Sequence, residues 1–258
     1  MNKFHSGLFF LATLIIAAFA PLSSYAVHAP QPVPETDYYA EGKDMPDYLE
    51  PMNRGIFEFN SFADRILLHP IASAYKDIVP EQSRAATGRF LRNLASPIVL
   101  ANSMLQGDVE NSFATFWRFC INSTLGLGGL FDVGSQIGMP YKKEDFGLTM
   151  GHYGVDHGTY LVLPILGPSS LRDGTGMIVD LFFDPLNYLP SDYDYVPYVL
   201  DSARVVNGRA AALDFTDTVD KVSLDPYATY RSGYSQRRYD MLKGDGNGAR
   251  SNDISAFK

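Results

Sequence analysis

The chain has a single cysteine among its 258 residues and no run of basic side chains. Cys120 therefore has no partner for an intramolecular disulfide, and stability has to come from packing or from lipid. We expect Cys120 to be a buried small hydrophobic residue within a helix. Lys and Arg total 21 against 29 Asp and Glu, a net charge of −8, and no basic stretch could follow a phosphate backbone. The sequence predicts no nucleic acid as a partner.

Apolar runs long enough to cross a bilayer are also missing after the N-terminal segment. Residues 7–20 (GLFFLATLIIAAFA) form an uncharged run that is short for the ~20 residues of a span. Ser24 and Ala26 then place small residues before a predicted cleavage site at Val27, so residues 1–26 are predicted to be a secretory signal peptide. An uncleaved anchor is the alternative. Amphipathic helices rich in aromatic residues could still lie in a bilayer interface.

The rest of the sequence divides into three parts. Residues 27–46 are predicted to be a Pro-rich linker, residues 47–242 a helical domain, and residues 243–258 a flexible polar tail. Periodicity within the domain is helical, which predicts an all-α fold.

Two helices show a clear apolar face. The first is predicted to begin at Asn53 as its N-cap, and the other, the fourth in the domain, at Asp108. The apolar face of the first consists of Ile56, Phe59, Ala63, Ile66 and Leu67. The face of the fourth consists of Phe113, Phe116, Trp117, Cys120 and Thr124.

Four further segments are predicted to be helical. They are residues 84–94, Ser96 to Gly107, about 197–222, and a last helix opened by Asp225-Pro226. Tyr227, Tyr230 and Tyr234 share one face of the last helix, which suits either a wet–dry boundary or core packing. Residues 177–183 (MIVDLFF) are apolar on nearly every side and are predicted to be buried in protein or in lipid.

Residues 126–138 (GLGGLFDVGSQIG) hold five glycines in thirteen positions. A phosphate-binding loop needs a preceding strand and a fixed glycine spacing or a lysine, and neither is present. The segment is predicted to be either a flexible hinge or a backbone held close to another group. The stretches that follow, GHYGVDHGTYLVLP and LPILGPSSLRDGTG, are predicted to be irregular but apolar.

His152, Asp156 and His157 are residue types that bind metals or move protons. The two histidines are five positions apart, which matches neither the HExxH spacing nor a Cys/His ligand pattern. The segment GPSSL lacks the second glycine of a nucleophile elbow. We expect no catalytic residue, no metal and no cofactor.

Four blocks resemble one family. They are DYLEPMNRGIFEFN (47–60), NLASPIVLANSMLQGDVENSFATFWRFCINSTLGLGGLFDV (93–133), FGLTMGHYGVDHGTYLVLPILGPSSLRD (146–173) and DPYATYRSGYSQRRYD (225–240). In this order they are similar to the MlaA family, also called VacJ.

The resemblance implies a ring-like or disc-like domain of amphipathic and interfacial helices, embedded in the outer membrane on its periplasmic side, with a central amphipathic channel. It also implies that mislocalised phospholipids pass from the outer leaflet to a periplasmic lipid carrier of the Mla pathway. A trimeric outer-membrane porin is the implied partner. The alternatives are a periplasmic hydrolase that uses residues 151–173 and a structural adaptor bound to a porin.

A phospholipid path needs polar groups for the headgroup and apolar groups for the acyl chains. The residues assigned to the headgroup are His152, Tyr153, Asp156 and His157, and those assigned to the acyl chains are Leu161, Leu163, Ile165 and Leu166. Plain packing is the alternative for each residue. The candidates are Gly126, Gly128, Gly129, Asp132, His152, Tyr153, Asp156, His157, Leu161, Leu163 and Pro164.

One departure from the family concerns the membrane anchor. Family members are typically acylated on a cysteine just after the signal peptide, whereas SSYAVHAP contains no cysteine. We expect interfacial helices or a porin to hold this protein at the membrane, with an uncleaved signal segment as the alternative.

Overall fold

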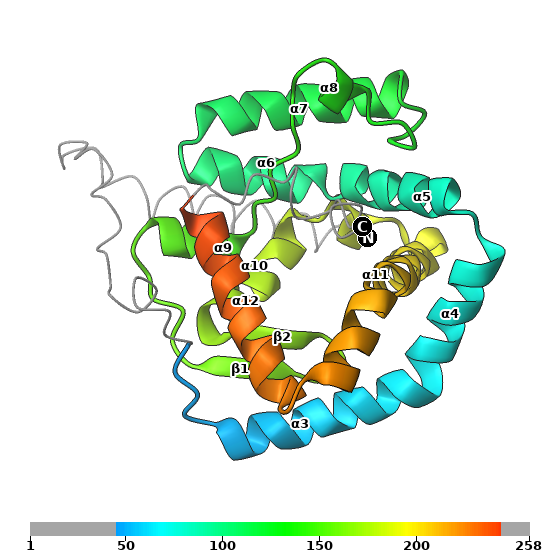
Figure 1. Cartoon of the computed structure of the whole chain (residues 1–258). Helices are drawn as coiled ribbons and strands as arrows, with labels where there is room; N and C mark the ends of the chain where they lie inside the picture. Colours follow the sequence, from blue (N-terminus) through cyan, green and yellow to red (C-terminus); the bar gives the residue numbers. More distant parts are fainter. Residues whose placement is uncertain (1–44, 244–258) are drawn as a thin grey trace. The chain divides into compact units, whose positions relative to one another are not determined.

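The computed structural model describes residues 45–243. The predicted signal peptide, the linker up to residue 44 and the tail from Gly244 lie outside the described residues. The fold is helical apart from one two-stranded sheet, which confirms the predicted class (Figure 1). In chain order the elements are α3 (Glu50–Ala63), η2 (Asp64–Leu68), α4 (His69–Ile78), α5 (Glu81–Leu94), α6 (Ser96–Leu105), α7 (Val109–Thr124), α8 (Val133–Gln136), α9 (Phe146–His152), β1 (Tyr160–Leu163), β2 (Gly167–Ser170), α10 (Leu171–Phe183), η3 (Pro185–Tyr188), η4 (Ser191–Tyr193), α11 (Tyr195–Val222) and α12 (Pro226–Leu242).

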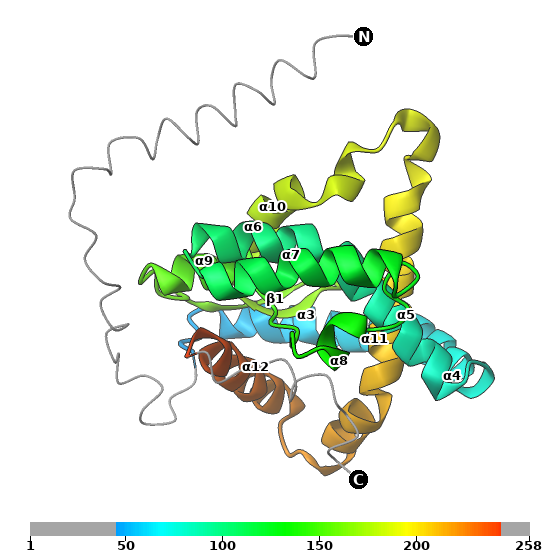
Figure 2. The same cartoon turned by 90° about the horizontal axis from the view of Figure 1, so that it is seen from above.

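The helices from α3 to α7 lie in one slab. In Figure 1, α3, α4 and α5 follow one another around its edge, and the β-hairpin, α10, α11 and α12 lie inside the curve. Figure 2 shows α6 and α7 side by side and the long α11 crossing the slab. Among residues 45–243, no helix combines the length with the hydropathy that a bilayer crossing requires.

Helix ends follow local chemistry where a capping side chain is present. The carboxylate of Asp108 accepts the N–H of Asn111 at the start of α7, and that of Asp225 accepts the N–H of Ala228 at the start of α12. These two predicted caps are confirmed.

The predicted cap at Asn53 is wrong. Helix α3 begins three residues earlier, and Asn53 lies inside it with its side chain fully buried. Its amide N–H₂ donates to the carbonyl of Tyr160, and its oxygen accepts the N–H of Val162. Two turns later, Asn60 makes the same pair of bonds with Leu163 and Ile165. The two asparagines therefore satisfy backbone groups along the edge of β1, as a neighbouring strand would.

The prediction of an irregular segment after residue 151 is wrong for its central part. Strands β1 and β2 form an antiparallel hairpin in which Tyr160 pairs with Ser170 and Leu163 with Gly167. Tyr160 and Val162 point into the core, whereas Leu161 and Leu163 are half-buried. This alternation is the pattern of a strand with one covered face, but four residues are too few to reveal it in the sequence.

The apolar core consists of two small clusters. One joins Met45, Tyr160, Val162 and Tyr227, with Tyr234 packed against it. Met45 belongs to this core although it falls in the predicted linker. Of the two roles considered for the tyrosines of the last helix, core packing is the one observed for Tyr227 and Tyr234. The other cluster joins α4 to α11 through Ala72, Ala210 and Leu213.

The interior is otherwise polar. Among residues 45–243, eighteen buried residues are polar or charged and eleven are hydrophobic, so hydrogen bonds and ion pairs hold much of the interior together. At its centre, Arg238 of α12 donates to Asp145, which caps α9, and to Asp173 of α10. Gly147 and Gly176 let α9 and α10 approach here, since a Cβ on Gly176 would lie 2.4 Å from the backbone nitrogen of Gly147.

Helix α7 turns its polar face inward and its aromatic face outward. Its buried residues are Asn111, Thr115, Arg118 and Asn122. Phe113, Phe116 and Trp117 are 65%, 46% and 42% exposed, and the ring of Trp117 packs edge-on against both phenylalanines. The predicted apolar face of α7 is therefore present, but it is the face that the other described residues leave uncovered.

The outward apolar face recurs in two other places. On α3 and η2, Phe59, Ile66 and Leu67 are exposed while Asn53 is buried. On α10, Ile178 and Phe182 are exposed, so the predicted burial of residues 177–183 in protein is wrong, and burial in lipid remains a prediction. Cys120 lies on the outer side of α7 and is only half-buried, contrary to expectation.

Candidate functional site

The glycine-rich segment is packed closely against the helices on either side of it. A Cβ on Gly126 would lie 2.3 Å from the carbonyl oxygen of Phe131, and one on Gly129 would lie 2.4 Å from the Cβ of Asn93 on α5. Gly128 and Gly129 also have positive φ angles of 74° and 97°. Of the two predicted roles, a backbone held close to another group is the one observed, and motion of the segment stays a prediction.

Asp132 anchors the end of this segment. It caps α8 by accepting the N–H of Ser135, and its carboxylate lies 3.0 Å from Arg118 and accepts the side-chain amide of Asn122. Burial alone would raise the pKa of Asp132, but the hydrogen bond from Ser135 and the charge of Arg118 together lower it below its usual value. Asp132 is therefore negatively charged at neutral pH, and its contacts hold the segment against α7.

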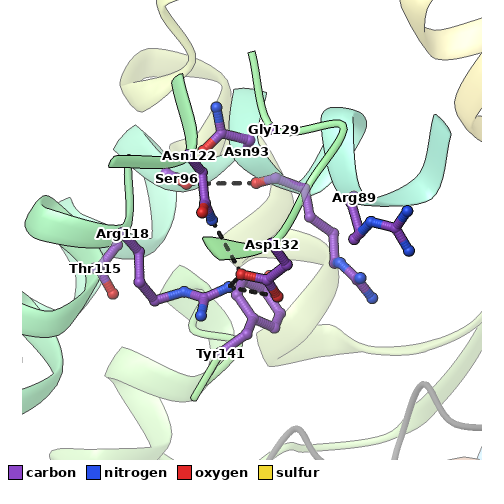
Figure 3. Close-up of a pocket in the computed structure, with 10 residues that line it drawn as sticks. Arg89, Asn93, Ser96, Thr115, Arg118, Asn122, Gly129, Asp132 and Tyr141 are labelled. Carbon is purple, nitrogen blue, oxygen red and sulfur yellow. Dashed lines mark hydrogen bonds and ion pairs between the residues drawn. The ribbon is translucent and has the colours of Figure 1, made fainter. Parts of the chain in front are cut away.

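Around this carboxylate lies a small polar pocket (Figure 3). Its volume is about 10 Å³, room for one water molecule. The lining comes from α5, from the first residue of α6, from the inner face of α7 and from the segment that follows α7. The lining residues are Arg89, Arg92, Asn93, Ser96, Thr115, Arg118, Asn122, Gly129, Asp132 and Tyr141. Figure 3 shows the guanidinium of Arg118 directed toward Asp132 and the ring of Tyr141 beside them.

The charges in the pocket are unequal, because three arginines and one carboxylate line it. Burial lowers the pKa of Arg92, and the positive charges of Arg118 and Arg89 lower it further against the opposing effects of Tyr141 and Asp132. The Arg92 guanidinium lies 5.7 Å from the ring centre of Tyr141, and that of Arg118 lies 5.8 Å from it. The pocket is a positively charged site with one fixed anion.

The second candidate segment separates its polar residues instead of gathering them. His152 ends α9 and is exposed, with its ring edge-on to that of Tyr153, whose hydroxyl donates to the carbonyl of Leu105. His157 is buried, with its Nδ1 3.2 Å from the carboxylate of the exposed Asp156. In the part of the chain that the structure describes, no three His, Cys, Asp or Glu side chains are grouped as a metal would require.

The apolar candidates lie on the hairpin. Leu161 and Leu163 are half-buried on β1, and Pro164 is exposed at the turn. Ile165 and Leu166, at the tip, are 70% and 69% exposed. None of the residues from 151 to 166 lines the arginine-rich pocket, so the predicted path residues fall into two groups: Gly129 and Asp132 at the pocket with Gly126 and Gly128 beside them, and the rest around the hairpin.

The serines of the GPSSL segment have structural roles. Both Ser169 and Ser170 are fully buried in β2, and Ser170 caps α10 by accepting the N–H of Asp173. A hydrolytic nucleophile has to meet its substrate, so these two serines give no support to the hydrolase alternative.

Sequence reasoning missed the four charged or aromatic residues that define the pocket. Arg89, Arg92, Arg118 and Tyr141 come from three separate segments, and the spacing of Arg89 and Arg92 is an ordinary helix repeat. The one available signal is Arg118, the single basic residue on an aromatic-rich helix. Only its position opposite the aromatic face distinguishes it from a solvated residue.

Comparisons with known proteins place these features in context. The model of the MlaA lipoprotein family matches residues 45–240. A protein of Rickettsia bellii is 41% identical over 197 residues, which cover 76% of this chain and 76% of that protein. The Escherichia coli K12 protein named intermembrane phospholipid transport system lipoprotein MlaA is 35% identical over 204 residues, 78% of this chain and 79% of that protein.

A solved structure from work on the "Structural basis for maintenance of bacterial outer membrane lipid asymmetry" matches with a TM-score of 0.65. It is 34% identical and covers 76% of this chain and 98% of that chain. The likeness therefore extends to the three-dimensional arrangement of nearly the whole of that structure.

Proposed function

The chain belongs to the MlaA lipoprotein family, and on this premise we propose that it removes mislocalised phospholipids from the outer leaflet of an outer membrane and passes them to a periplasmic carrier. It acts as a transport component of an intermembrane phospholipid system, as its named relatives do. No covalent bond is made or broken in this role.

The observation that carries the proposal is the outward apolar face of the helices. Phe113 and Phe116 of α7, and Ile66 of η2, are each between 46% and 65% exposed, while buried positions on α3 and α7 hold asparagine and arginine. Burying a Phe or Ile side chain away from water is worth about 1.5–3 kcal/mol, so a surface of this kind is unfavourable in water and favourable in lipid. Because no described helix can span a bilayer, we propose that these helices lie within one leaflet.

A polar interior inside an apolar exterior also suits the passage of a lipid. Charged headgroups need polar neighbours inside the bilayer, and the acyl chains need apolar ones. We assign the headgroup to the polar candidates from Gly126 to His157 and the chains to Leu161, Leu163 and Pro164. Exposed Ile165 and Leu166 at the hairpin tip are further apolar contacts of the right kind.

The proposed partners rest on the family resemblance. They are a trimeric outer-membrane porin, which holds the protein in place, and a soluble periplasmic carrier, which receives the lipid. The proposed location is the periplasmic side of the outer membrane. Affinity purification of the tagged protein from outer membranes tests the porin: a trimeric porin should be recovered with it, and its absence would remove this partner.

Lipid content is the direct test of transport. Protein solubilised from membranes in a mild detergent is extracted with organic solvent, and its lipids are identified by mass spectrometry. We expect bound phospholipid in near-stoichiometric amount. A protein free of phospholipid would favour the alternative of a structural adaptor.

The cellular test measures the outer leaflet. A strain that lacks the protein should expose phospholipid at its surface and become sensitive to detergent and chelator, and the restored gene should reverse both. Normal surface lipid in the deletion strain would refute the transport role.

A further inference from the structure

The pocket bounded by α5, the start of α6, α7 and residues 129–141 is here called the arginine pocket, and it carries more positive than negative charge. Arg89, Arg92 and Arg118 line it, and Asp132 is the one carboxylate among the described residues that does so. Asp132 is already engaged by Arg118 at 3.0 Å, and it accepts the hydroxyl of Ser135 at 2.7 Å. The excess of charge therefore lies with α5.

Two hydroxyl groups in the pocket form only long hydrogen bonds. The hydroxyl of Ser96 donates to a carbonyl at 3.5 Å, and that of Thr115 donates to Asn111 at the same distance of 3.5 Å. Both distances are at the upper limit of a hydrogen bond. Both side chains are buried, so a stronger acceptor in the pocket would gain two donors at little cost in conformational entropy.

We propose that the arginine pocket binds a phosphate group, which is either the phosphodiester of a phospholipid headgroup or a free phosphate. Arginine is suited to this ligand because its planar guanidinium presents paired N–H donors to phosphate oxygens. The lipid source rests on the proposed transport function, whereas the free-phosphate source does not.

The size of the pocket sets a condition on binding. A volume of about 10 Å³ holds one water molecule, so a phosphate group enters only when side chains at the rim move. Arg89 and Arg92 are half-buried and have long stems, and the Nε–H of Arg89 donates to the carbonyl of Leu130 at 2.8 Å, a bond that breaks when Arg89 moves. Arg118 is held by Ser135, Asp132 and the carbonyl of Met139, and it stays in place.

The carboxylate of Asp132 repels any anion, so whether a phosphate group binds depends on the net charge of the pocket. Its repulsion is offset first by Arg118, which it contacts directly, and the charges of Arg89 and Arg92 then favour the ligand. Because this attraction is partly exposed, it should weaken as the ionic strength rises.

Calorimetric titration of the purified full-length protein in a neutral detergent tests the proposal. The probes are inorganic phosphate and dihexanoylphosphatidylglycerol, and dihexanoylglycerol serves as the probe without phosphate. The variants are Arg89→Gln and Arg92→Gln. Arg204→Gln, which removes an equally charged side chain from the surface pair with Asp201 on α11, is the matched control.

We expect at least one phosphate-bearing probe to bind, and each pocket variant to weaken it by about tenfold or more. Arg204→Gln should leave the affinity within about twofold. Binding of the lipid alone identifies the headgroup as the ligand, and binding of inorganic phosphate alone identifies free phosphate; both support the pocket. Circular dichroism and unfolding temperatures confirm that each variant is folded, and the half-buried Arg89 provides a second variant if Arg92→Gln fails to fold.

The proposal is overturned if neither phosphate-bearing probe binds, or if both pocket variants bind as the wild type does. The lipid content of the same preparations separates this result from a failure of the transport role. Phospholipid that is retained equally by all variants would reject the pocket and leave transport intact. Phosphate binding by a protein that carries no lipid would support the pocket and reject the transport role.

Discussion

Replacing Arg238 by methionine should destabilise the fold at neutral pH and should do so much less in acid. Arg238 lies between two carboxylates, with N–H groups 2.7 and 2.9 Å from Asp145 and 2.8 Å from Asp173. The side chains of Arg238 and Asp173 are only 7% and 4% exposed. Methionine keeps much of the length of the side chain but removes the charge, so both carboxylates lose their shared partner.

The size of the effect follows from what each carboxylate retains. Asp173 keeps Arg172 and the hydroxyl of Tyr234, whereas Asp145 keeps the backbone N–H of Leu148. Removing one member of a buried ion pair costs about 3–5 kcal/mol. The buried Nε of Arg238 has no hydrogen-bond partner among the described residues, so its removal recovers about 1 kcal/mol. We expect a net loss of roughly 3 kcal/mol, a large part of the 5–15 kcal/mol typical of a folded domain.

The pH dependence follows from the direction of the pKa shifts. Burial alone would raise the pKa of Asp145 and of Asp173, but the hydrogen bonds and charge of Arg238 lower both below the ordinary value. A carboxylate with a depressed pKa contributes stability above its unfolded pKa, and this contribution is lost as the pH falls through the folded pKa. In the variant, burial is no longer opposed by Arg238, so the pKa of Asp145 rises and protonation relieves the buried charge. The loss in stability should therefore shrink as the pH is lowered towards about 4.

Urea unfolding in mild detergent, followed by circular dichroism at neutral pH and at about pH 4, measures both effects. The control is Arg204→Met, which breaks an exposed pair with Asp201 and should cost no more than about 1 kcal/mol. A loss below about 1 kcal/mol for Arg238→Met, or an equal loss at both pH values, would refute this account of the buried triad.

Three other predictions concern the backbone, the hairpin and the N-terminus. Gly129→Ala should lower the free energy of unfolding by roughly 1–3 kcal/mol more than Gly138→Ala does. Both glycines have positive φ, but only Gly129 has a neighbour, Asn93, in the space that a Cβ would fill. Equal losses of stability in urea unfolding would contradict this. Asn53→Ala should lower the free energy of unfolding by about 3 kcal/mol, since it leaves two buried backbone groups of β1 unpaired. A protease should then cut the hairpin faster, and an unchanged cleavage rate would argue that Asn53 does not hold β1 in place. Intact-mass analysis should find a mature N-terminus at Val27 without an acyl chain, and a mass excess of a diacylglyceryl group would overturn this expectation.

The positions of several helices could be read from the sequence because their signals are local. Asp108 and Asp225 each cap a helix whose first N–H groups lie within three residues of the capping side chain. Asn53 has the same residue type and is placed before the same kind of apolar pattern. Its amide instead serves β1, more than a hundred residues away in the chain, and no local rule could reveal that.

The candidate site was predicted only in part for a related reason. The glycines of 126–129 and Asp132 stand out in the sequence because close backbone approach and helix capping need those residue types. The arginines of α5 and α7 do not stand out, since charged residues at helical spacing are ordinary on a solvated face. They form a pocket only because the two helices and the following segment pack together.

Local patterns are enough to show that the helices are amphipathic, where α7 and α12 begin, and which family the chain resembles. Periodicity divides a helix into two faces but carries no information about which face meets the rest of the chain. Which face of α7 is buried depends on tertiary packing: Arg118 and Asn122 point inward, whereas Phe113 and Trp117 point outward. A buried arginine requires hydrogen bonds and an opposite charge, so the polar face can turn inward only where the rest of the chain provides them. Here Asp132 and Ser135 provide them for α7.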